Sequence, residues 1–496
     1  MNILAIDQST AGTKAIIFTA DGQMVARKDV AHRQITDHRG RVEHDPLEIW
    51  HNTLTAARQV METVNIPSTQ IAAIAITNQR ETAVCWDRRT GQPLAHAIVW
   101  QCGRAAEITE KLISQGAAAW VRERTGLLLS PYFSAAKFAW IVQNIPEAGD
   151  LLAAGHLCCG TIDAWLLYKM TCGQAFKTDF SNASRTQLLN LDTLTWDDEM
   201  LALFGLNRTA MPEVGMSDRL FGETTLDGLF SRPVPIRAMI GDSHAALFAN
   251  NCLSPYTAKA TFGTGTSVMM NVGHNRRPPQ DESIVESIAW GINNRVSYVL
   301  EGNINYSGAI IHWLVNDIHL IDHAGQSGEL AAAVDSTHGV YLVPAFSGLG
   351  APYWDHDARA AFVGMSRGTR REHLVRAAEE AIAYQIADVV DALNASCPQP
   401  LALLSVDGGA TRDAFLMQFV ADIINVPIQI AAIEELSAAG AAYVALLAAG
   451  FSIRDRLLAK PRTAPLRPDL DPKKRAELRL GWKNALKMVT VKPQEE

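Results

Sequence analysis

The stretch NILAIDQSTAGTKAIIF, residues 2 to 18, carries the pattern that decides the fold. Ile3 to Ile6 is an apolar, partly β-branched run, Asp7 to Gly12 is small and polar, and Thr13 to Phe18 is again mostly apolar. Two such runs around a short polar turn predict a β-hairpin. A similar unit, TAKATFGTGTSVMMN, occupies residues 257 to 271. Because the unit recurs, the sequence predicts two duplicated lobes.

The length and the order of elements support this division. A chain of 496 residues exceeds the size at which a single core usually stops growing, so we expect two domains, at residues 1–248 and 249–496. Apolar runs such as Ile71 to Ile76 alternate with helical patterns such as Pro46 to Val64 and Arg371 to Leu393. The expected fold class is therefore α/β, with ligands at the polar strand ends.

Composition excludes several classes of protein. A net charge of -8 argues against a nucleic-acid partner, and we interpret the basic segment Lys473 to Arg475 as the solvated face of a helix. The N-terminus lacks the features of a secretory signal, and the apolar stretch Ala438 to Phe451 is too short to span a bilayer. Seven irregularly spaced cysteines indicate no disulfide framework. We expect a cytoplasmic protein without a membrane role.

Two turns have the composition of phosphate cradles. Gly, Ser and Thr in Asp7 to Lys14 and in Gly263 to Ser267 expose backbone N–H groups to an anion without an intervening Cβ. Either turn alone is weak support for a phosphate site, but two such turns in matching contexts are much stronger support. Gly12-Thr13-Lys14 lacks the first glycine of a P-loop, and Val268 replaces the third glycine of a dinucleotide fingerprint. The site is of neither of these kinds.

Two aspartates suit phosphoryl transfer from a nucleoside triphosphate. Such a transfer needs a metal anchor for the phosphates and a base for the attacking hydroxyl. Asp7 suits the Mg²⁺ role through water, because Mg²⁺ keeps most of its hydration shell. Asp242, between the apolar run Ala238 to Ile240 and a helical run, suits the base, with capping of the helix as the equally weighted alternative.

Four further residues could hold a hydroxylated substrate. Arg80 and Glu81 follow a buried strand and offer a donor and an acceptor side by side, although a surface ion pair is the alternative. Trp100 and Tyr132 could wall a pocket, although aromatic residues are more often part of a core. The residue types alone leave both alternatives open.

Long co-linear segments make the chain similar to a known family. It resembles the FGGY carbohydrate kinases nearly end to end, and most closely those members that phosphorylate glycerol. The segments that carry the resemblance are Val42–Pro46, Ile76–Thr82, Ile98–Cys102, Pro131–Ser134, Asn182–Thr186, Phe346–Asp355 and Val406–Ala410.

The resemblance implies two actin-like, ribonuclease H-like lobes with ATP, Mg²⁺ and a polyol in the cleft between them. It assigns Asp242 as the base and Asp7 as the Mg²⁺ residue. The polyol would be surrounded by Arg80, Glu81, Trp100, Tyr132, Asp242, Ser243 and Ser267. The nucleotide and its phosphates would lie against Thr10, Ala11, Gly12, Lys14, Gly263, Thr264, Gly265, Gly308, His312, Gly409, Ala410 and Asp413.

Departures from the family pattern leave the substrate open. Glycerol-phosphorylating members carry Gln where this chain has Ser243 and Phe where it has Ser267, so both positions lose bulk. The expected activity is phosphorylation of glycerol to sn-glycerol 3-phosphate. The alternatives are a kinase for a tetritol, pentitol or ketopentose, and, more remotely, an actin-like ATPase scaffold.

Two expectations concern regulation and assembly. The loop from Leu226 to Pro233 lacks the Gly- and Arg-containing pattern that binds fructose 1,6-bisphosphate in enterobacterial relatives, so we expect no sensing of this inhibitor. Homodimers and homotetramers are common in the family that the chain resembles, but no interface can be identified from the sequence.

Overall fold

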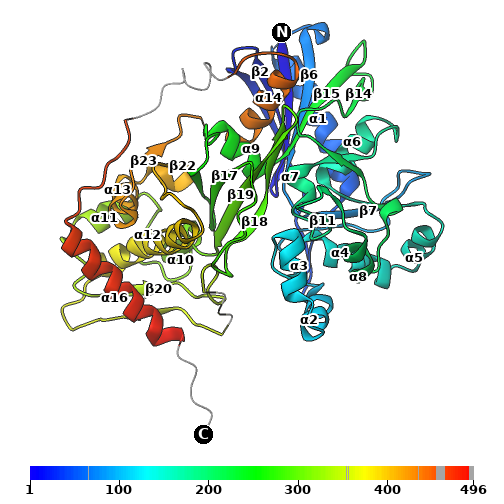
Figure 1. The fold of residues 1–496 in the computed structure, drawn as a ribbon. Helices are drawn as coiled ribbons and strands as arrows, with labels where there is room; N and C mark the ends of the chain where they lie inside the picture. Colours follow the sequence, from blue (N-terminus) through cyan, green and yellow to red (C-terminus); the bar gives the residue numbers. More distant parts are fainter. Residues whose placement is uncertain (65, 354, 356, 434, 454–463, 491–496) are drawn as a thin grey trace.

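Two mixed six-stranded sheets, one in each half of the chain, organise the molecule (Figure 1). The structure is a computed structural model that describes residues 1–64, 66–353, 355, 357–433, 435–453 and 464–490. The strands of the first sheet, in spatial order, are β14 (Gly222–Thr224), β15 (Val234–Gly241), β6 (Ile71–Asn78), β1 (Asn2–Gln8), β2 (Gly12–Thr19) and β3 (Met24–Ala31). Those of the second are β18 (Val285–Ile292), β19 (Arg295–Ile304), β17 (Thr266–Gly273), β16 (Thr257–Phe262), β22 (Leu404–Gly408) and β23 (Ile428–Ile430).

Both hairpins predicted from the sequence are present. β1 pairs antiparallel with β2, and β16 pairs antiparallel with β17. Each hairpin also has a parallel neighbour on its first strand, β6 beside β1 and β22 beside β16. The expected first turn, Asp7 to Gly12, was too long, because Asp7 pairs with Lys14 and Gln8 with Thr13 inside the ladder. Asp7 is therefore held by a strand rather than by a loop.

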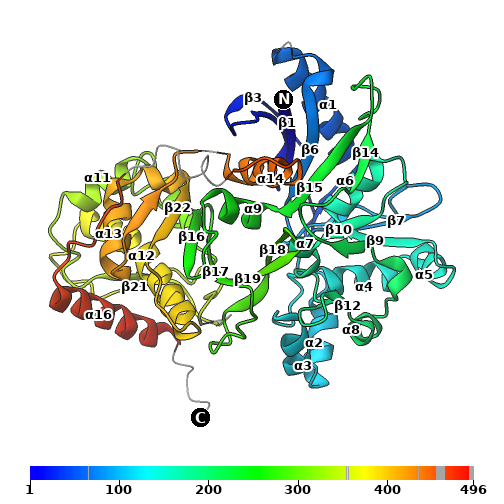
Figure 2. The same ribbon diagram turned by 45° about the horizontal axis from the view of Figure 1, so that its top comes forward.

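Helices cover both faces of the first sheet. α1 (Pro46–Val64) packs against β2 and β3 with the bounds that the sequence predicted, and its buried residues lie on one side of the helix. α9 (Asp242–Ala249) and α14 (Leu436–Ala448) lie side by side, and α14 packs on β1, β6 and β15 (Figure 2). A Cβ on Gly440 would lie 1.9 Å from the carbonyl oxygen of Ala245, so glycine permits this close approach. α14 contains most of the apolar stretch from Ala438 to Phe451 and ends at Ala448.

The second lobe is built mainly on helix α12. α12 (Arg371–Ala395) packs against α11 (Gln326–Ala332), α13 (Ala414–Ile424) and the sheet strands β17 and β19. α13 begins at Ala414, because Asp413 caps it by accepting the N–H of Leu416. Residues Gly409–Arg412 form a 3₁₀ turn.

The remaining elements are smaller. A third sheet orders β4 (Ile35–Thr36), β5 (Val42–His44), β8 (Ala97–Ile98), β7 (Ala83–Asp87) and β9 (Leu157–Thr161). The other paired strands are β10 (Lys177–Asp179) with β13 (Glu213–Gly215), β11 (Leu189–Asn190) with β12 (Thr195–Trp196), and β20 (Tyr341–Val343) with β21 (Ala361–Val363). The other α-helices are α2 (Ala106–Ser114), α3 (Ala118–Thr125), α4 (Ser134–Asn144), α5 (Pro146–Ala153), α6 (Ile162–Met170), α7 (Phe180–Ala183), α8 (Asp198–Leu203), α10 (Gly308–Asn316) and α16 (Pro472–Thr490), and two further 3₁₀ turns span Ser68–Gln70 and Arg208–Ala210.

Two exclusions drawn from composition can be compared with the structure. All seven cysteines are free; five of them are buried, whereas Cys172 is exposed and Cys397 is half-buried. Among the described residues, none of the helices combines the length and the apolar character needed to cross a membrane. The predicted basic helix is α16, where Lys473 to Arg475 lie at or near the surface.

Candidate active site

Three strand ends of the first sheet bring the predicted carboxylates together. β1, β6 and β15 run parallel, so their carboxyl ends meet at one edge of the sheet. β1 carries Asp7, the residues after β6 include Arg80 and Glu81, and β15 leads directly into α9, whose first residue is Asp242. Gly241 occupies the N-cap position, so the alternative interpretation of Asp242 as the cap does not describe this helix.

Arg80 connects Asp242 to the second lobe. Its Nε lies 3.3 Å from Asp242 Oδ1, and its Nη groups donate to both oxygens of Glu301 at 3.0 and 3.2 Å. Arg80 is only 6% exposed, so it is no surface residue. Desolvation in the cleft raises the pKa of Asp242 above its usual range, and the charge of Arg80 opposes this rise.

A buried ion network holds these groups in place. Glu301 on β19 is fully buried and pairs with Arg80 and with Arg185, whose Nη1 lies 2.8 Å from Glu301 Oε2. Arg185 Nε also donates to Glu81 Oε1 at 2.6 Å. The sequence analysis assigned no role to Glu301 or Arg185. The available signal was the carboxylate of Glu301 in the middle of a strand, directly after the apolar pair Val299 and Leu300.

An aromatic wall closes the other side of this region. The rings of Trp100 and Tyr132 meet edge to face with centroids 5.6 Å apart. Trp100 Nε1 donates to the hydroxyl of Thr10 at 3.0 Å, so this wall is tied to the first predicted phosphate turn. Both rings line a cavity, and Tyr132 also packs against a small apolar cluster of Leu127, Phe133 and Val285.

A cavity of about 470 Å³ lies between the two lobes next to this wall, and we call it the acceptor cavity. Its lining includes the predicted Trp100 and Tyr132, together with Arg185 and Glu301. Arg80, Glu81 and Ser267 do not line this cavity, but each contacts a residue that does. Arg80 and Ser267 donate to Glu301, Ser267 at 2.8 Å, and Glu81 accepts a hydrogen bond from Arg185. The full lining is Trp100, Gln101, Cys102, Gly103, Leu128, Ser130, Pro131, Tyr132, Phe133, Arg185, Ser283, Val285, Glu301, Asn303, Asn305 and Ser347.

Ser243 stands apart from this network. Its backbone N–H donates to Asp242 Oδ1 at 2.6 Å, which stabilises the carboxylate that follows β15. Its side chain forms no hydrogen bond among the described residues. The structure therefore places Ser243 beside the candidate base without a contact to the acceptor cavity.

Asp7 has the surroundings expected of a metal anchor. It is 4% exposed, and burial raises its pKa to about 7, while Lys14, 3.9 Å away, opposes the rise and Asp242 adds to it. Lys14 itself pairs with Glu435 at 2.7 Å. The described residues contain no cluster of three metal-ligating side chains. A single carboxylate fits Mg²⁺, which binds through one or two carboxylates, water and phosphate oxygens.

The second phosphate turn is shaped by its backbone. The N–H of Gly263 donates to the carbonyl of Gly265, and the carbonyl of Thr264 accepts the N–H groups of Ser307 and Ala309 at the start of α10. A Cβ on Gly265 would lie 2.2 Å from the carbonyl oxygen of Ile304. Glycine is required there, because any side chain would push the turn away from β19.

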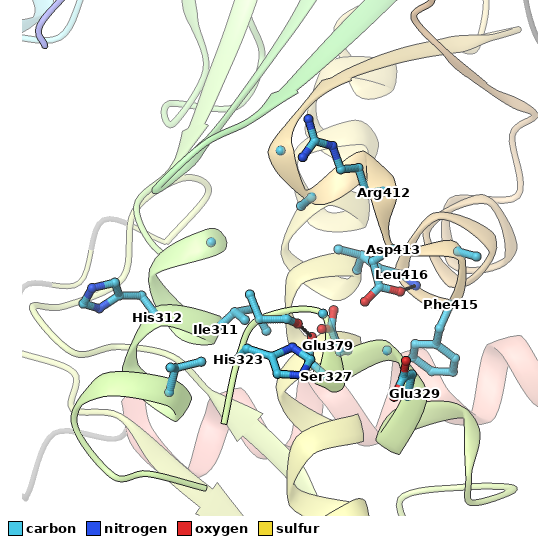
Figure 3. A pocket seen from close by; sticks show the side chains of 18 of the residues that line it. Ile311, His312, His323, Ser327, Glu329, Glu379, Arg412, Asp413, Phe415 and Leu416 are labelled. Carbon is cyan, nitrogen blue, oxygen red and sulfur yellow. Dashed lines mark hydrogen bonds between the residues drawn. The ribbon is translucent and has the colours of Figure 1, made fainter. Parts of the chain in front are cut away.

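A second cavity of about 1230 Å³ opens beyond this turn in the second lobe (Figure 3). Five of the residues predicted for the nucleotide line it: Gly308, His312, Gly409, Ala410 and Asp413. Figure 3 shows their surroundings, with Ile311, His323 and Ser327 on one side and Arg412, Phe415 and Leu416 on the other. Glu379, which the sequence analysis missed, is buried in this wall, and burial raises its pKa to about 8.

The two lobes, each built on a hairpin with a parallel neighbouring strand, have the actin-like fold. Models of the N-terminal and C-terminal domains of the FGGY family of carbohydrate kinases match residues 2–249 and 258–449. The chain therefore belongs to the FGGY family of carbohydrate kinases, and it is an ATP-dependent phosphotransferase that acts on an alcohol group.

Similar proteins extend over nearly the whole chain. The "Glycerol kinase" of Caldanaerobacter subterraneus subsp. tengcongensis is 44% identical over 98% of this chain and 97% of its own. The "Glycerol kinase 1" of Thermotoga maritima is also 44% identical, over 98% and 99%. Among solved structures, Plasmodium falciparum glycerol kinase with ADP superposes with a TM-score of 0.94 at 33% identity, covering 99% of both chains. A xylulose kinase from Lactobacillus acidophilus, at 20% identity over 98% and 97%, shares the fold with a TM-score of 0.89.

Proposed function

We propose that the chain transfers the γ-phosphoryl group of ATP to a terminal hydroxyl of glycerol, with Asp242 as the general base. The observation that carries this proposal is the contact of Asp242 with Arg80, which Glu301 holds from the opposite lobe. Such a bridge aligns a base with a guanidinium that can donate to a substrate hydroxyl at the boundary between the lobes, and alignment is the main requirement of phosphoryl transfer. The names of the 44% identical relatives support glycerol as the acceptor.

The remaining roles follow from the groups at the cleft. Arg80 donates to one substrate hydroxyl, Glu81 accepts from another, and Trp100 and Tyr132 pack against the carbon chain. Backbone N–H groups of Thr10, Ala11 and Gly12 in the first turn, and of Thr264 and Gly265 in the second, bind the phosphates, and Gly263 shapes the second turn.

Asp7 would hold Mg²⁺ through water, and Mg²⁺ when bound supplies charge neutralisation of the phosphates. Lys14 extends from the strand after the first turn to the same region. Gly308, His312, Gly409, Ala410 and Asp413 bind the nucleoside end. Closure of the lobes excludes water, which would otherwise compete with the substrate hydroxyl.

Release of ADP by the purified chain tests this proposal. With Mg²⁺ and ATP, we expect glycerol to stimulate ADP formation and sn-glycerol 3-phosphate to accumulate in equal amount, because each phosphoryl group that leaves ATP is transferred to glycerol and not to water. ADP formation that is the same with and without any polyol would contradict the proposal and favour the scaffold alternative.

The activity should depend on pH through Asp242. A base must be ionised, and the pKa of Asp242 is raised by desolvation, so activity is present above that pKa and lost as the pH falls through it. We expect the acidic limb of kcat/KM to lie above the ordinary carboxyl range of about 4. A profile that stays flat down to about pH 4 would rule out a base with a raised pKa.

Several other predictions remain untested. The division of the chain after residue 248, a cytoplasmic location, the absence of a nucleic-acid partner, a homodimeric or homotetrameric state and insensitivity to fructose 1,6-bisphosphate stay predictions from the sequence. Addition of fructose 1,6-bisphosphate to the same ADP assay checks the last of them.

A further inference from the structure

A closed ring of hydrogen bonds connects the first phosphate turn to the aromatic wall of the acceptor cavity. It begins at Thr10, whose carbonyl accepts from Gln34 Nε2 at 2.6 Å. Gln34 Oε1 accepts from His44 Nε2 at 2.8 Å, and His44 Nδ1 accepts from Gln79 Nε2 at 3.2 Å. These three contacts form the first half of the ring.

The second half of the ring returns along the acceptor side. Gln79 Oε1 accepts from the hydroxyl of Thr82 at 3.0 Å, and the oxygen of that hydroxyl accepts from the backbone N–H of Trp100 at 3.3 Å. Trp100 Nε1 then donates to the hydroxyl of Thr10 at 3.0 Å, which closes the ring. We call these six residues the cleft ring: Thr10, Gln34, His44, Gln79, Thr82 and Trp100.

Donors and acceptors match at every contact of the cleft ring. His44 carries its proton on Nε2, because the amide oxygen of Gln34 can only accept, and its Nδ1 then accepts from Gln79. Burial lowers the pKa of His44 to about 3, and the neighbouring His32 adds to this effect. His44 therefore stays neutral at physiological pH, and the ring keeps one set of donor directions.

Burial shields the centre of the cleft ring from water. His44 and Thr82 are fully buried, and Gln79 is only 2% exposed. The imidazole of His32 packs edge to face on that of His44 with centroids 4.3 Å apart, and its Nε2 donates to the carbonyl of Thr10 at 2.9 Å. A buried polar network whose members are bonded to one another makes the groups that it joins more rigid.

The cleft ring joins two different sheets. Thr10 lies between β1 and β2, and Gln79 directly follows β6, all strands of the first six-stranded sheet. His44 ends β5, Thr82 directly precedes β7, and Trp100 follows β8, which are strands of the third sheet. The phosphate turn thus belongs to one sheet and the aromatic wall to another, so their separation depends on contacts between these sheets.

We propose that His44 is a positioning residue for phosphoryl transfer, which fixes the aromatic wall relative to the first phosphate turn through the cleft ring. His44 itself lines neither of the two cavities. The inference rests on the proposed function, in which Thr10 binds phosphate and Trp100 packs against the acceptor. Transfer requires the attacking oxygen to lie in line with the γ-phosphoryl group, and a misplacement of about 1 Å can lower the rate by about 10²-fold.

Two single variants open the cleft ring at the same contact. His44→Asn keeps an acceptor towards Gln79 but removes the donor to Gln34, and Gln34→Ala removes an exposed side chain together with both of its contacts. We expect each variant to lower kcat by about tenfold or more, with smaller changes in the KM of glycerol and of ATP. The reason is that the groups that bind the substrates remain, and only their relative position is lost.

A second measurement separates alignment from folding. When the acceptor is displaced, water can take the phosphoryl group, so the ratio of ADP to sn-glycerol 3-phosphate formed should rise above its wild-type value in both variants. The double variant should lose no more kcat than the more affected single variant, because one lost contact already opens the ring. Gln59→Ala, at an exposed glutamine on α1, is the matched control and should leave kcat and the ratio unchanged.

The outcomes separate this inference from the proposed function. A lower kcat with a raised ratio in both ring variants, without additivity and absent from the control, supports the inference. Wild-type kcat and ratio in both variants, even with a lower Tm, or losses that add in the double variant, overturn the inference and leave the proposed function intact. Failure of glycerol to stimulate ADP release in the wild type overturns both. If His44→Asn does not fold, Gln34→Ala provides the test, because its side chain lies at the surface.

Discussion

Replacement of Asp242 by Asn is expected to lower kcat by about 10²- to 10⁴-fold, the usual contribution of a general base. Asn keeps the size of the side chain and can still lie beside Arg80, but it cannot accept the proton of the substrate hydroxyl. The acceptor and the nucleotide should both still bind, because their other contacts are unchanged. Steady-state ADP release gives kcat, and calorimetric titration with ADP gives the nucleotide affinity.

A matched variant separates the loss of a base from the loss of a charge. Asp198→Asn removes a carboxylate whose side chain is 73% exposed on α8, and it should leave kcat unchanged. Near-normal kcat in Asp242→Asn would refute the role of Asp242. A loss of ADP binding together with kcat would instead show that Asp242 acts on the nucleotide.

Replacement of Glu301 by Gln is expected to destabilise the chain by about 3–5 kcal/mol, as is typical when one partner of a buried ion network is removed. Glu301 is fully buried and holds both Arg80 and Arg185, so the neutral amide leaves two buried guanidinium groups without their counter-charge. The urea midpoint, followed by tryptophan fluorescence, measures the loss.

The same variant should also affect turnover. Arg80 contacts Asp242 on one side and Glu301 on the other. Without the carboxylate of Glu301, Arg80 is no longer held in position beside Asp242. Glu199 is 64% exposed and pairs with Arg124, so Glu199→Gln is the control and should change stability by less than about 1 kcal/mol. A Glu301→Gln protein as stable as this control would show that the network does not support the fold.

Local patterns were sufficient for the secondary structure near the site. Both hairpins and the helix Pro46–Val64 are confirmed, because alternation and helical periodicity reflect which side of an element is buried. The length of the first turn was wrong. Strand pairing extends through Asp7 and Gln8, and that register depends on hydrogen bonds to β2 and β6 that a polar composition does not reveal.

The sequence was sufficient to predict those site residues that lie at the carboxyl ends of strands. Asp7, Arg80 and Asp242 each follow an apolar run, and parallel strands bring those ends to one edge of the sheet. Five nucleotide-site residues line the second cavity for the related reason that loops at strand and helix ends face the cleft. Glu301 and Arg185 were not predicted, because the role of a charged residue inside a buried element depends on its ionic partner, which the sequence does not show.

The sequence by itself determined the duplicated α/β architecture, the family and the chemical class of the site, because apolar periodicity and strand-end residues are local properties of the chain. Only the tertiary structure decided which charges meet across the lobes and which residues line the acceptor cavity. Those features join residues more than two hundred positions apart, such as Arg80 and Glu301, and contacts at that separation arise from packing of the two lobes.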